Sequence, residues 1–413
     1  MSLRKLAVNF TSILSANALS RVISLVYIII LSRYLGAADI GVYGTLFAYI
    51  SFGNVIADFG INRMLVRDIA RAPTSAQAFL DRVVTLRLIL SAISFAVWLG
   101  VIALIGYRDE RVLQLAPVAL LSILPYSLGL TFDGILRAWE RMRPAAAAIV
   151  VFEVSKLAFL LLIIQAGLYL TAVLCSLALA FIVYVVWLGA ILSRAGLKIR
   201  CSIQPDAWRQ LLLLSFPFAL LGAVEMMHGR LDQILLKALA TDAAQAGYYF
   251  NAHRIMDVTL ILPAAVSIVL VPRFARNYVN HANRIRADYY KTLGILAAAG
   301  AAVAAAVYGL GPWAVRLVFG EAFAPAAPVL QVLTISIFFF FLQYANVTFL
   351  IASDLQWKIF IMSLIQVSVN LAANLALIPR LGMYGAAWAN VLSTSLGFLL
   401  YYYLVKRTLQ ASS

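Results

Sequence analysis

Few of the 413 residues carry a charge, and very few are suited to bind a metal. Charged side chains make up 12% of the chain, and there are only two cysteines and three histidines. Cys175 lies in an apolar run and Cys201 in a polar segment, which argues against a disulfide framework or a cysteine-based metal site. The histidines are not spaced as metal ligands. We therefore expect that both cysteines are structural thiols and that the protein binds no cofactor.

Common enzyme signatures are also missing. The sequence contains no P-loop, no H-E-x-x-H zinc pattern and no G-x-S-x-G nucleophile turn. Without a nucleotide site, the chain cannot act alone as an ATP-driven pump. We expect a protein that is not an enzyme.

Apolar residues are abundant instead, at 64% of the chain. A soluble domain is nearer half apolar and a quarter charged. A span through the hydrocarbon of a bilayer needs about 20 apolar residues, and strands of membrane β-barrels would alternate in polarity. Twelve apolar runs of about this length occur, without that alternation, at about 9–32, 41–60, 83–106, 112–136, 145–166, 169–193, 211–237, 247–271, 290–311, 327–352, 357–378 and 384–405. The sequence predicts an all-α integral membrane protein with about twelve transmembrane helices.

The basic residues indicate how these helices are oriented. With the N-terminus inside and strict alternation, 22 lysines and arginines fall in inner segments and 6 in outer ones. The positive-inside rule therefore places both termini in the cytoplasm, with the protein in the inner membrane. The net charge of +15 reflects these helix ends rather than a clustered nucleic-acid interface. We expect the first apolar run to be retained as a helix, because 8–15 makes a poor signal core.

The two halves of the chain resemble each other. The motif Gly41-Val42-Tyr43 after the first span matches Gly247-Tyr248-Tyr249 after the seventh, and Gly167 matches Gly382 in a later loop. Six helices per half, both starting inside, predict parallel repeats, which we divide at residues 1–200 and 201–413. Transporters often bind substrate between such repeats.

Four basic residues lie well inside the predicted spans, at least seven residues from either end: Arg21, Lys156, Arg230 and Arg254. An arginine at a helix centre costs roughly 2.5–3.5 kcal/mol, so it usually faces the bundle interior or a wet cavity. Arg21 shares a polar helix face with Asn17, Ser20 and Ser24. It either presents a cation to an anionic substrate or forms a buried ion pair with an acid such as Glu225.

Span 8 contains a second candidate group. Asp257 follows His253 by four residues and Arg254 by three, so its carboxylate can reach either side chain. Arg254 is a candidate phosphate ligand, and Asp257 either holds it in place or carries a coupling cation. The alternative is a locally satisfied pair with no further role.

Span 7 places Glu225, His228 and Asp232 on one helix face. Glu225 and His228 are candidates for carrying a coupling proton or sodium ion, and a structural hydrogen-bond network is the alternative. Arg230 lies off this face and is a further candidate for substrate binding.

Other polar residues inside spans predict helix contacts. Lys156 follows Glu153 by three residues, so we expect an intrahelical pair, although Lys156 is also a candidate for substrate binding. A ladder on one face of span 11 predicts hydrogen bonds between helices: Ser363, Gln366, Asn370 and Asn374.

Prolines inside four spans predict kinks or breaks: Pro117, Pro125, Pro217 and Pro263. Two glycine pairs predict close helix packing: Gly41 with Gly44, and Gly129 with Gly134.

Several motifs, taken in order, resemble a known family. They are LGAADIGVY at 35–43, DFGI at 58–61, VRDIAR at 66–71, LRAWERMR at 136–143, FGEAF at 319–323 and PRLGMYGAAWA at 379–389. This series resembles the Wzx-type polysaccharide flippases of the multidrug/oligosaccharidyl-lipid/polysaccharide exporter superfamily. It covers nearly the whole chain.

The resemblance implies two six-helix lobes around a central cavity. It also implies a role in turning undecaprenyl-diphosphate-linked oligosaccharides from the inner to the outer leaflet, for exopolysaccharide or lipopolysaccharide assembly, with polysaccharide polymerase machinery as a possible partner. Cationic residues line the cavities of such proteins, and Arg21 and Arg254 occupy matching helices. A diphosphate crossing hydrocarbon needs such cations, because arginine is always charged and binds phosphate bidentately.

Three rival functions differ from this one in testable ways. A cation-coupled multidrug exporter would depend on Glu225 or Asp257 more than on Arg21. A major-facilitator transporter would carry a G-x-x-x-D-[RK]-x-G-[RK]-[RK] pattern between spans 2 and 3, and this chain does not. A membrane polymerase or ligase would need a long outer loop, whereas the predicted outer loops are short.

Overall fold

The computed structural model describes residues 3–105, 107, 109–267, 270, 274 and 282–411, with the backbone alone described over 3–18 and 282–284. Every regular element in these ranges is a helix. The helices are α1 (Leu3–Asp58), α2 (Ile61–Arg71), α3 (Ala76–Ile105), α4 (Arg111–Leu120), α5 (Ile123–Ala138), α6 (Met142–Gln165), α7 (Leu170–Arg194), α8 (Pro205–Leu239), α9 (Gln245–Thr259), α11 (Ala282–Phe319), α12 (Ala326–Ala352), α13 (Gln356–Leu381) and α14 (Met383–Ala411), with short 3₁₀ turns at Pro73–Ser75 and Glu321–Phe323.

The predicted membrane spans correspond to these helices. Among the described residues, nine helical segments are long and apolar enough to cross a membrane. The first of them, Leu19–Asp58, overlaps both of the first two predicted spans. They are separated by a bend at Gly36, whose φ of 76° and ψ of 176° are not helical. Helices α9 and α14 correspond to predicted spans 8 and 12 but are not among the nine. The prediction of an all-α membrane protein is confirmed.

Two of the four prolines interrupt their spans. Proline has no N–H, so Pro125 cannot bond the carbonyl of Leu121, and the helix breaks there between α4 and α5. Pro263 likewise cannot bond the carbonyl of Thr259, where α9 ends. Pro117 and Pro217 lie inside α4 and α8 without ending them.

By their internal contacts, the residues form two compact units. Unit 1 comprises Met1–Leu35 and Thr45–Met226, and unit 2 comprises Gly36–Gly44 and Met227–Ser413. The chain therefore passes between units inside helices α1 and α8. The division into six-helix lobes at residues 200 and 201 stays a prediction.

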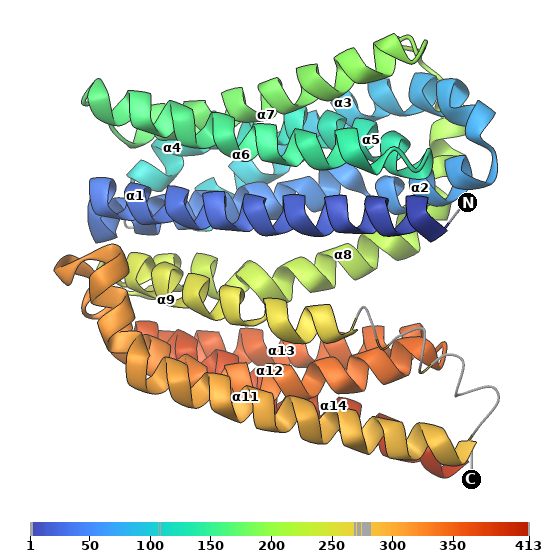
Figure 1. The fold of residues 1–413 in the computed structure, drawn as a ribbon. Coiled ribbons are helices and arrows are strands. Elements are labelled where there is room, and N and C mark those ends of the chain that lie inside the picture. The colour runs from blue at the N-terminus through green and yellow to red at the C-terminus, as the bar shows by residue number, and fades with distance from the viewer. Residues whose placement is uncertain are drawn as a thin grey trace. The chain divides into compact units, whose positions relative to one another are not determined.

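A tight turn in unit 1 leads from α1 into α2, which lies at the same end of the unit as the start of α1 (Figure 1). Phe59 and Gly60 both have positive φ, at 46° and 72°. Helix α2 is amphipathic, and its buried face joins the core of the unit through Ile61, Met64, Leu65 and Ile69. Beneath the turn, the fully buried Arg87 donates hydrogen bonds to Asp58 at 2.7 Å and to the carbonyl of Ala57 at 3.1 Å.

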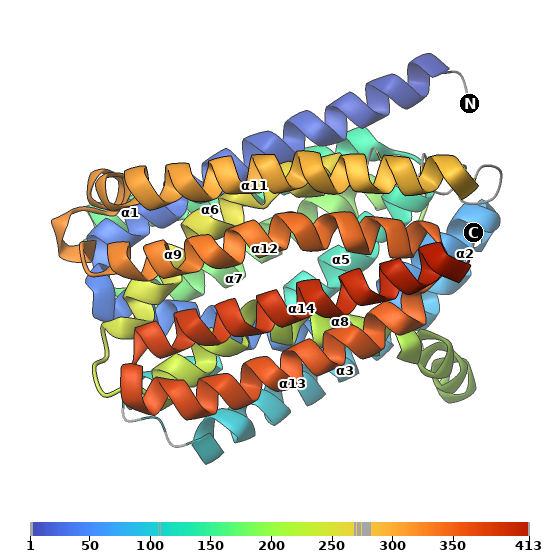
Figure 2. The same cartoon turned by 90° about the horizontal axis from the view of Figure 1, so that it is seen from below.

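Unit 2 is built on four long helices that lie in the order α11, α12, α14, α13 (Figure 2). Helix α9 packs against α12 and α14. The predicted polar ladder on α13 is confirmed as a set of interhelical bonds. Gln366 accepts a hydrogen bond from Gln343 of α12 at 3.2 Å, and Asn370 donates to Ser393 of α14 at 3.2 Å. Asn374 reaches a different partner, Asp232 on α8, described below.

Candidate functional site

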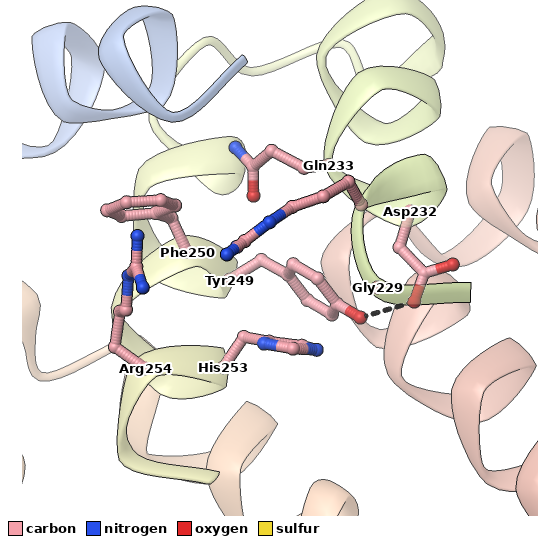
Figure 3. Close-up of a pocket in the computed structure, with 8 residues that line it drawn as sticks. Gly229, Asp232, Gln233, Tyr249, Phe250, His253 and Arg254 are labelled. Carbon is pink, nitrogen blue, oxygen red and sulfur yellow. Dashed lines mark hydrogen bonds between the residues drawn. The ribbon is translucent and has the colours of Figure 1, made fainter. Parts of the chain in front are cut away.

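Helices α8 and α9 of unit 2 enclose a narrow crevice lined by polar and charged side chains (Figure 3). Its lining residues are Gly229, Arg230, Asp232 and Gln233 from α8, and Tyr249, Phe250, His253 and Arg254 from α9. The crevice holds about 10 Å³, roughly the space of a single water molecule. It is therefore too small to admit a phosphate group, but it brings two arginines from predicted spans to one place.

Arg254 is held by contacts within its own helix. Its guanidinium carbon lies 4.9 Å from the ring centroid of Phe250, and its Nη1 lies 3.8 Å from the Asp257 carboxylate. Asp257 also lies 3.3 Å from Nδ1 of His253. The predicted reach of Asp257 to both neighbours is thus confirmed. A quarter of the Arg254 side chain stays exposed, so the charge is oriented but still accessible.

A buried carboxylate lies behind the crevice, and sequence reasoning did not give it a central role. Asp232 is 5% exposed. It accepts hydrogen bonds from the Tyr249 hydroxyl at 2.7 Å (Figure 3), from Asn374 at 2.7 Å and from Asn390 at 3.2 Å. Within the described ranges, no cation lies at ion-pair distance from it. A negative charge is thus surrounded by neutral donors alone.

The Asp232 cluster is rich in oxygen. The side-chain carbonyl oxygens of Asn374 and Asn390 are buried and accept no hydrogen bond from any described residue. In the part of the chain that the structure describes, no group of three or more histidine, cysteine, aspartate and glutamate side chains could hold a metal ion. One carboxylate with amide oxygens is instead suited to a proton or a weakly held hard cation such as sodium, which prefers oxygen ligands.

The other predicted coupling residues have different surroundings. Glu225 belongs to unit 1, is 65% exposed, and accepts a hydrogen bond from Arg63 at 2.8 Å. The alternative of a buried ion pair between Arg21 and Glu225 is therefore wrong in this structure. His228 packs its ring edge-on against Phe340, with centroids 5.7 Å apart, and its buried Nε2 makes no hydrogen bond among the described residues.

The remaining substrate-binding candidates divide into a buried and an exposed residue. Lys156 is 8% exposed, lies 2.6 Å from Glu153, and sits 4.6 Å from the ring centroid of Tyr27. The predicted intrahelical pair is confirmed. Arg21 is exposed and has no hydrogen bond or ion pair within the described residues. The side chain of Asn17 lies outside the described residues, so its place beside Arg21 stays a prediction.

The fold resembles that of several solved membrane transporters. An inward-facing multidrug resistance MATE family transporter of the MOP superfamily matches with a TM-score of 0.77 at 15% identity, covering 95% of each chain. The lipid II flippase MurJ, in an inward closed conformation, matches with a TM-score of 0.74 at 16% identity, covering 95% of this chain and 87% of MurJ.

A third structure is a MOP superfamily transporter from Pyrococcus furiosus, whose binding pocket is described as having reverse polarity. It matches with a TM-score of 0.65 at 15% identity, covering 99% of this chain and 95% of that one. The search of curated proteins gives no match to this sequence.

These matches define the class: a multi-pass helical membrane protein with the fold of MOP superfamily transporters. The sequence profile of the polysaccharide biosynthesis protein family matches residues 6–278. The chain belongs to that family.

Proposed function

We propose that this protein is a flippase that moves oligosaccharides linked to an undecaprenyl diphosphate from the cytoplasmic to the outer leaflet of the inner membrane. It works by alternating access, with both termini in the cytoplasm. Membership of the polysaccharide biosynthesis family supports the glycan part, and the fold shared with a lipid II flippase supports the transport part. On this proposal it is a transporter rather than an enzyme.

The observation that carries the proposal is the placing of arginines inside predicted spans. Arg21 is exposed on its helix, and a quarter of the Arg254 side chain is exposed. Arg230 lines the crevice beside Arg254, which is too small for a phosphate in this structure. A diphosphate cannot enter hydrocarbon without compensating charge, and arginine supplies it with bidentate hydrogen bonds. Cations of this kind are costly inside a membrane and are kept where they meet a substrate or a water-filled path.

Replacing the arginines tests the proposal. Arg21→Ala or Arg254→Ala should abolish export of the lipid-linked glycan while membrane protein levels stay close to those of the parent. Arg194→Ala is the matched control, because Arg194 is exposed at the end of α7. Export measured in cells, with protein quantified by immunoblot, gives the result. Loss of folded protein in both Arg21 and Arg254 variants would instead assign these arginines a structural role.

A cation-coupled multidrug exporter is the second candidate, favoured by the match to a multidrug transporter and by the buried Asp232. An exporter of cationic drugs would need carboxylates rather than arginines. Glu225→Gln or Asp257→Asn would then abolish efflux of a cationic dye, and Arg21→Ala would not. Efflux from vesicles separates the two functions.

We also propose that Asp232, with Asn374 and Asn390, binds the ion that drives transport. No cation among the described side chains lies at ion-pair distance from it, and the two amides that donate to it also carry oxygens with no hydrogen bond among the described residues. Binding a proton or sodium ion there would relieve the cost of a buried charge. Of the three coupling residues predicted from sequence, Glu225 and His228 lack comparable oxygen partners, and Asp257 lies against His253 and Arg254.

A further inference from the structure

Arg63, just after the second predicted span, and Glu225, in the seventh, form an ion pair in which both side chains are exposed. Arg63 is 47% exposed and Glu225 65%, and their atoms are 2.8 Å apart. Exposed pairs of this kind contribute little to stability. Nothing in the fold of unit 1 therefore requires these two groups to stay together, and a stronger anion can replace the carboxylate at little cost.

Arg63 is also the first of three arginines on one face of α2. Arg63, Arg67 and Arg71 follow one another at intervals of four residues, so they form a row about 12 Å long. The apolar side of α2 is buried in the core of unit 1, and all three arginines are exposed. We call these three residues the α2 arginine row.

Two acidic residues form ion pairs with this row, each with a different arginine. Asp68 lies 2.7 Å from the Arg67 guanidinium, and this hydrogen bond raises the pKa of Arg67 above its ordinary value. Glu225 lies at the Arg63 end. Arg71 has no ion pair within the described residues. The row thus keeps a net positive charge and ends at a carboxylate on α8.

The charge of the ligand decides what can occupy such a row. A phospholipid phosphodiester carries one negative charge, as the Glu225 carboxylate does. Charge alone therefore gives the phospholipid no advantage over Glu225 in binding Arg63. A diphosphate carries more charge and offers several oxygens to neighbouring guanidiniums, whose Cβ atoms are roughly 5–6 Å apart at this spacing. The geometry therefore favours a diphosphate over a membrane phospholipid.

We propose that the α2 arginine row receives the diphosphate of the substrate on the cytoplasmic side, and that Glu225 occupies Arg63 until the diphosphate displaces it. This inference rests on the proposed function. It also rests on the alternation of predicted spans, which places the segment between the second span and the third, with α2 in it, on the cytoplasmic side. Glu225 then acts as a positioning residue: it holds Arg63 in place in the substrate-free protein and touches neither lipid nor glycan.

Binding of an isoprenyl diphosphate to the purified protein tests this role. The full chain is placed in nanodiscs of phosphatidylcholine, with the matching isoprenyl monophosphate and phosphatidylglycerol as comparison ligands. Removing the competing carboxylate with Glu225→Gln should tighten diphosphate binding roughly two- to fivefold, the factor that an exposed ion pair is worth. Arg63→Ala should weaken it, and Arg63→Lys should bind at an intermediate strength.

A double variant separates competition from a general charge effect. In the Arg63→Ala background, Glu225→Gln should leave diphosphate affinity unchanged, since no Arg63 remains to be released. The matched control is the exposed pair Arg316 and Glu321 in unit 2, whose atoms are 3.8 Å apart. Glu321→Gln should leave the affinity unchanged. Thermal melting of each variant verifies that it is folded.

The outcomes distinguish this inference from the proposed function. If the parent protein binds the diphosphate and Glu225→Gln binds it with the same affinity, the displacement role of Glu225 is wrong and the flippase proposal stands. Equal binding of phosphatidylglycerol, with the same response to Arg63→Ala, would make the row a general site for anionic lipid. Failure of the parent to bind any isoprenyl diphosphate would count against the proposed function itself.

Discussion

Asp232 illustrates how a buried charge can be kept without a counterion. Its carboxylate is bound by a hydroxyl and two amide groups, so each of its hydrogen bonds comes from a neutral donor. Neutral donors lower the cost of burying a carboxylate but do not cancel its charge. The residue is thus poised to take up a cation, which is the basis of its proposed role in coupling.

Asp232→Asn removes this charge and keeps the shape of the side chain. We expect near-normal amounts of folded protein, because the Tyr249 hydroxyl can turn to remain bonded, and transport that no longer responds to a proton or sodium gradient. Transport into vesicles with imposed gradients measures this, with Asp206→Asn at the exposed start of α8 as the control. A full gradient response in Asp232→Asn would leave Asp232 with a structural role only.

Contacts within one helix could be predicted from the sequence, and contacts between distant helices could not. The pairs Lys156–Glu153 and Arg254–Asp257 follow from the helical repeat, since residues three or four apart share a face. The bonds from Asn374 and Asn390 to Asp232 join residues 142 and 158 positions apart. Helical periodicity places Asp232 and Asn374 on polar helix faces and does not single out Asn390. Only the packing of α8, α13 and α14 brings the three together.

At the scale of elements, hydropathy located the helices, while special backbone positions determine where they turn. The turn from α1 into α2 depends on Gly60, whose φ of 72° favours glycine. A Cβ added there would lie 2.6 Å from the Cβ of Phe218 and 2.7 Å from the amide of Ala219. The DFGI motif at 58–61 is one of the motifs that carry the family resemblance. Its physical role is to form this close turn against α8.

Gly60→Ala should therefore destabilise unit 1. The left-handed conformation alone costs about 1–2 kcal/mol for a residue with a Cβ, and the contact with the α8 backbone adds to it. We expect the apparent melting temperature in detergent to fall by several degrees. Gly100→Ala in α3 is the control, because a Cβ there meets nothing within 4 Å, and it should be neutral or slightly stabilising. Equal melting of the two variants would contradict this account of the turn.

At the scale of the whole molecule, the two sequence repeats meet at their matching glycines. A Cβ on Gly41 would lie 3.0 Å from the amide of Gly247, and a Cβ on Gly247 would lie 1.9 Å from the carbonyl oxygen of Ala37. Residues 36–44 accordingly belong to unit 2, although they are part of α1. The sequence predicted close packing at Gly41, but not that the two repeat motifs are each other's partner.

If the moving halves divide at residues 200 and 201 as the sequence predicts, this contact joins them, and alternating access requires it to open once in each transport cycle. A disulfide between Gly41→Cys and Ala246→Cys would prevent this. The ideal Cβ of Gly41 lies 3.2 Å from the Cβ of Ala246, so a small shift brings the pair into disulfide geometry. Because Cys175 and Cys201 are free and exposed, both are first replaced by serine. Oxidation should then stop glycan export, and reduction should restore it.

Each single cysteine variant provides the control, since it must export normally under oxidising conditions for the effect to belong to the cross-link. Gly247→Ala tests the same contact without oxidation. The added methyl group cannot share space with the Ala37 carbonyl, so it should keep the contact open and reduce export. Cross-linking is verified by mobility on a gel. Full export by a completely cross-linked protein would show that this contact does not open during transport, and the rocking motion would then have to open at another seam.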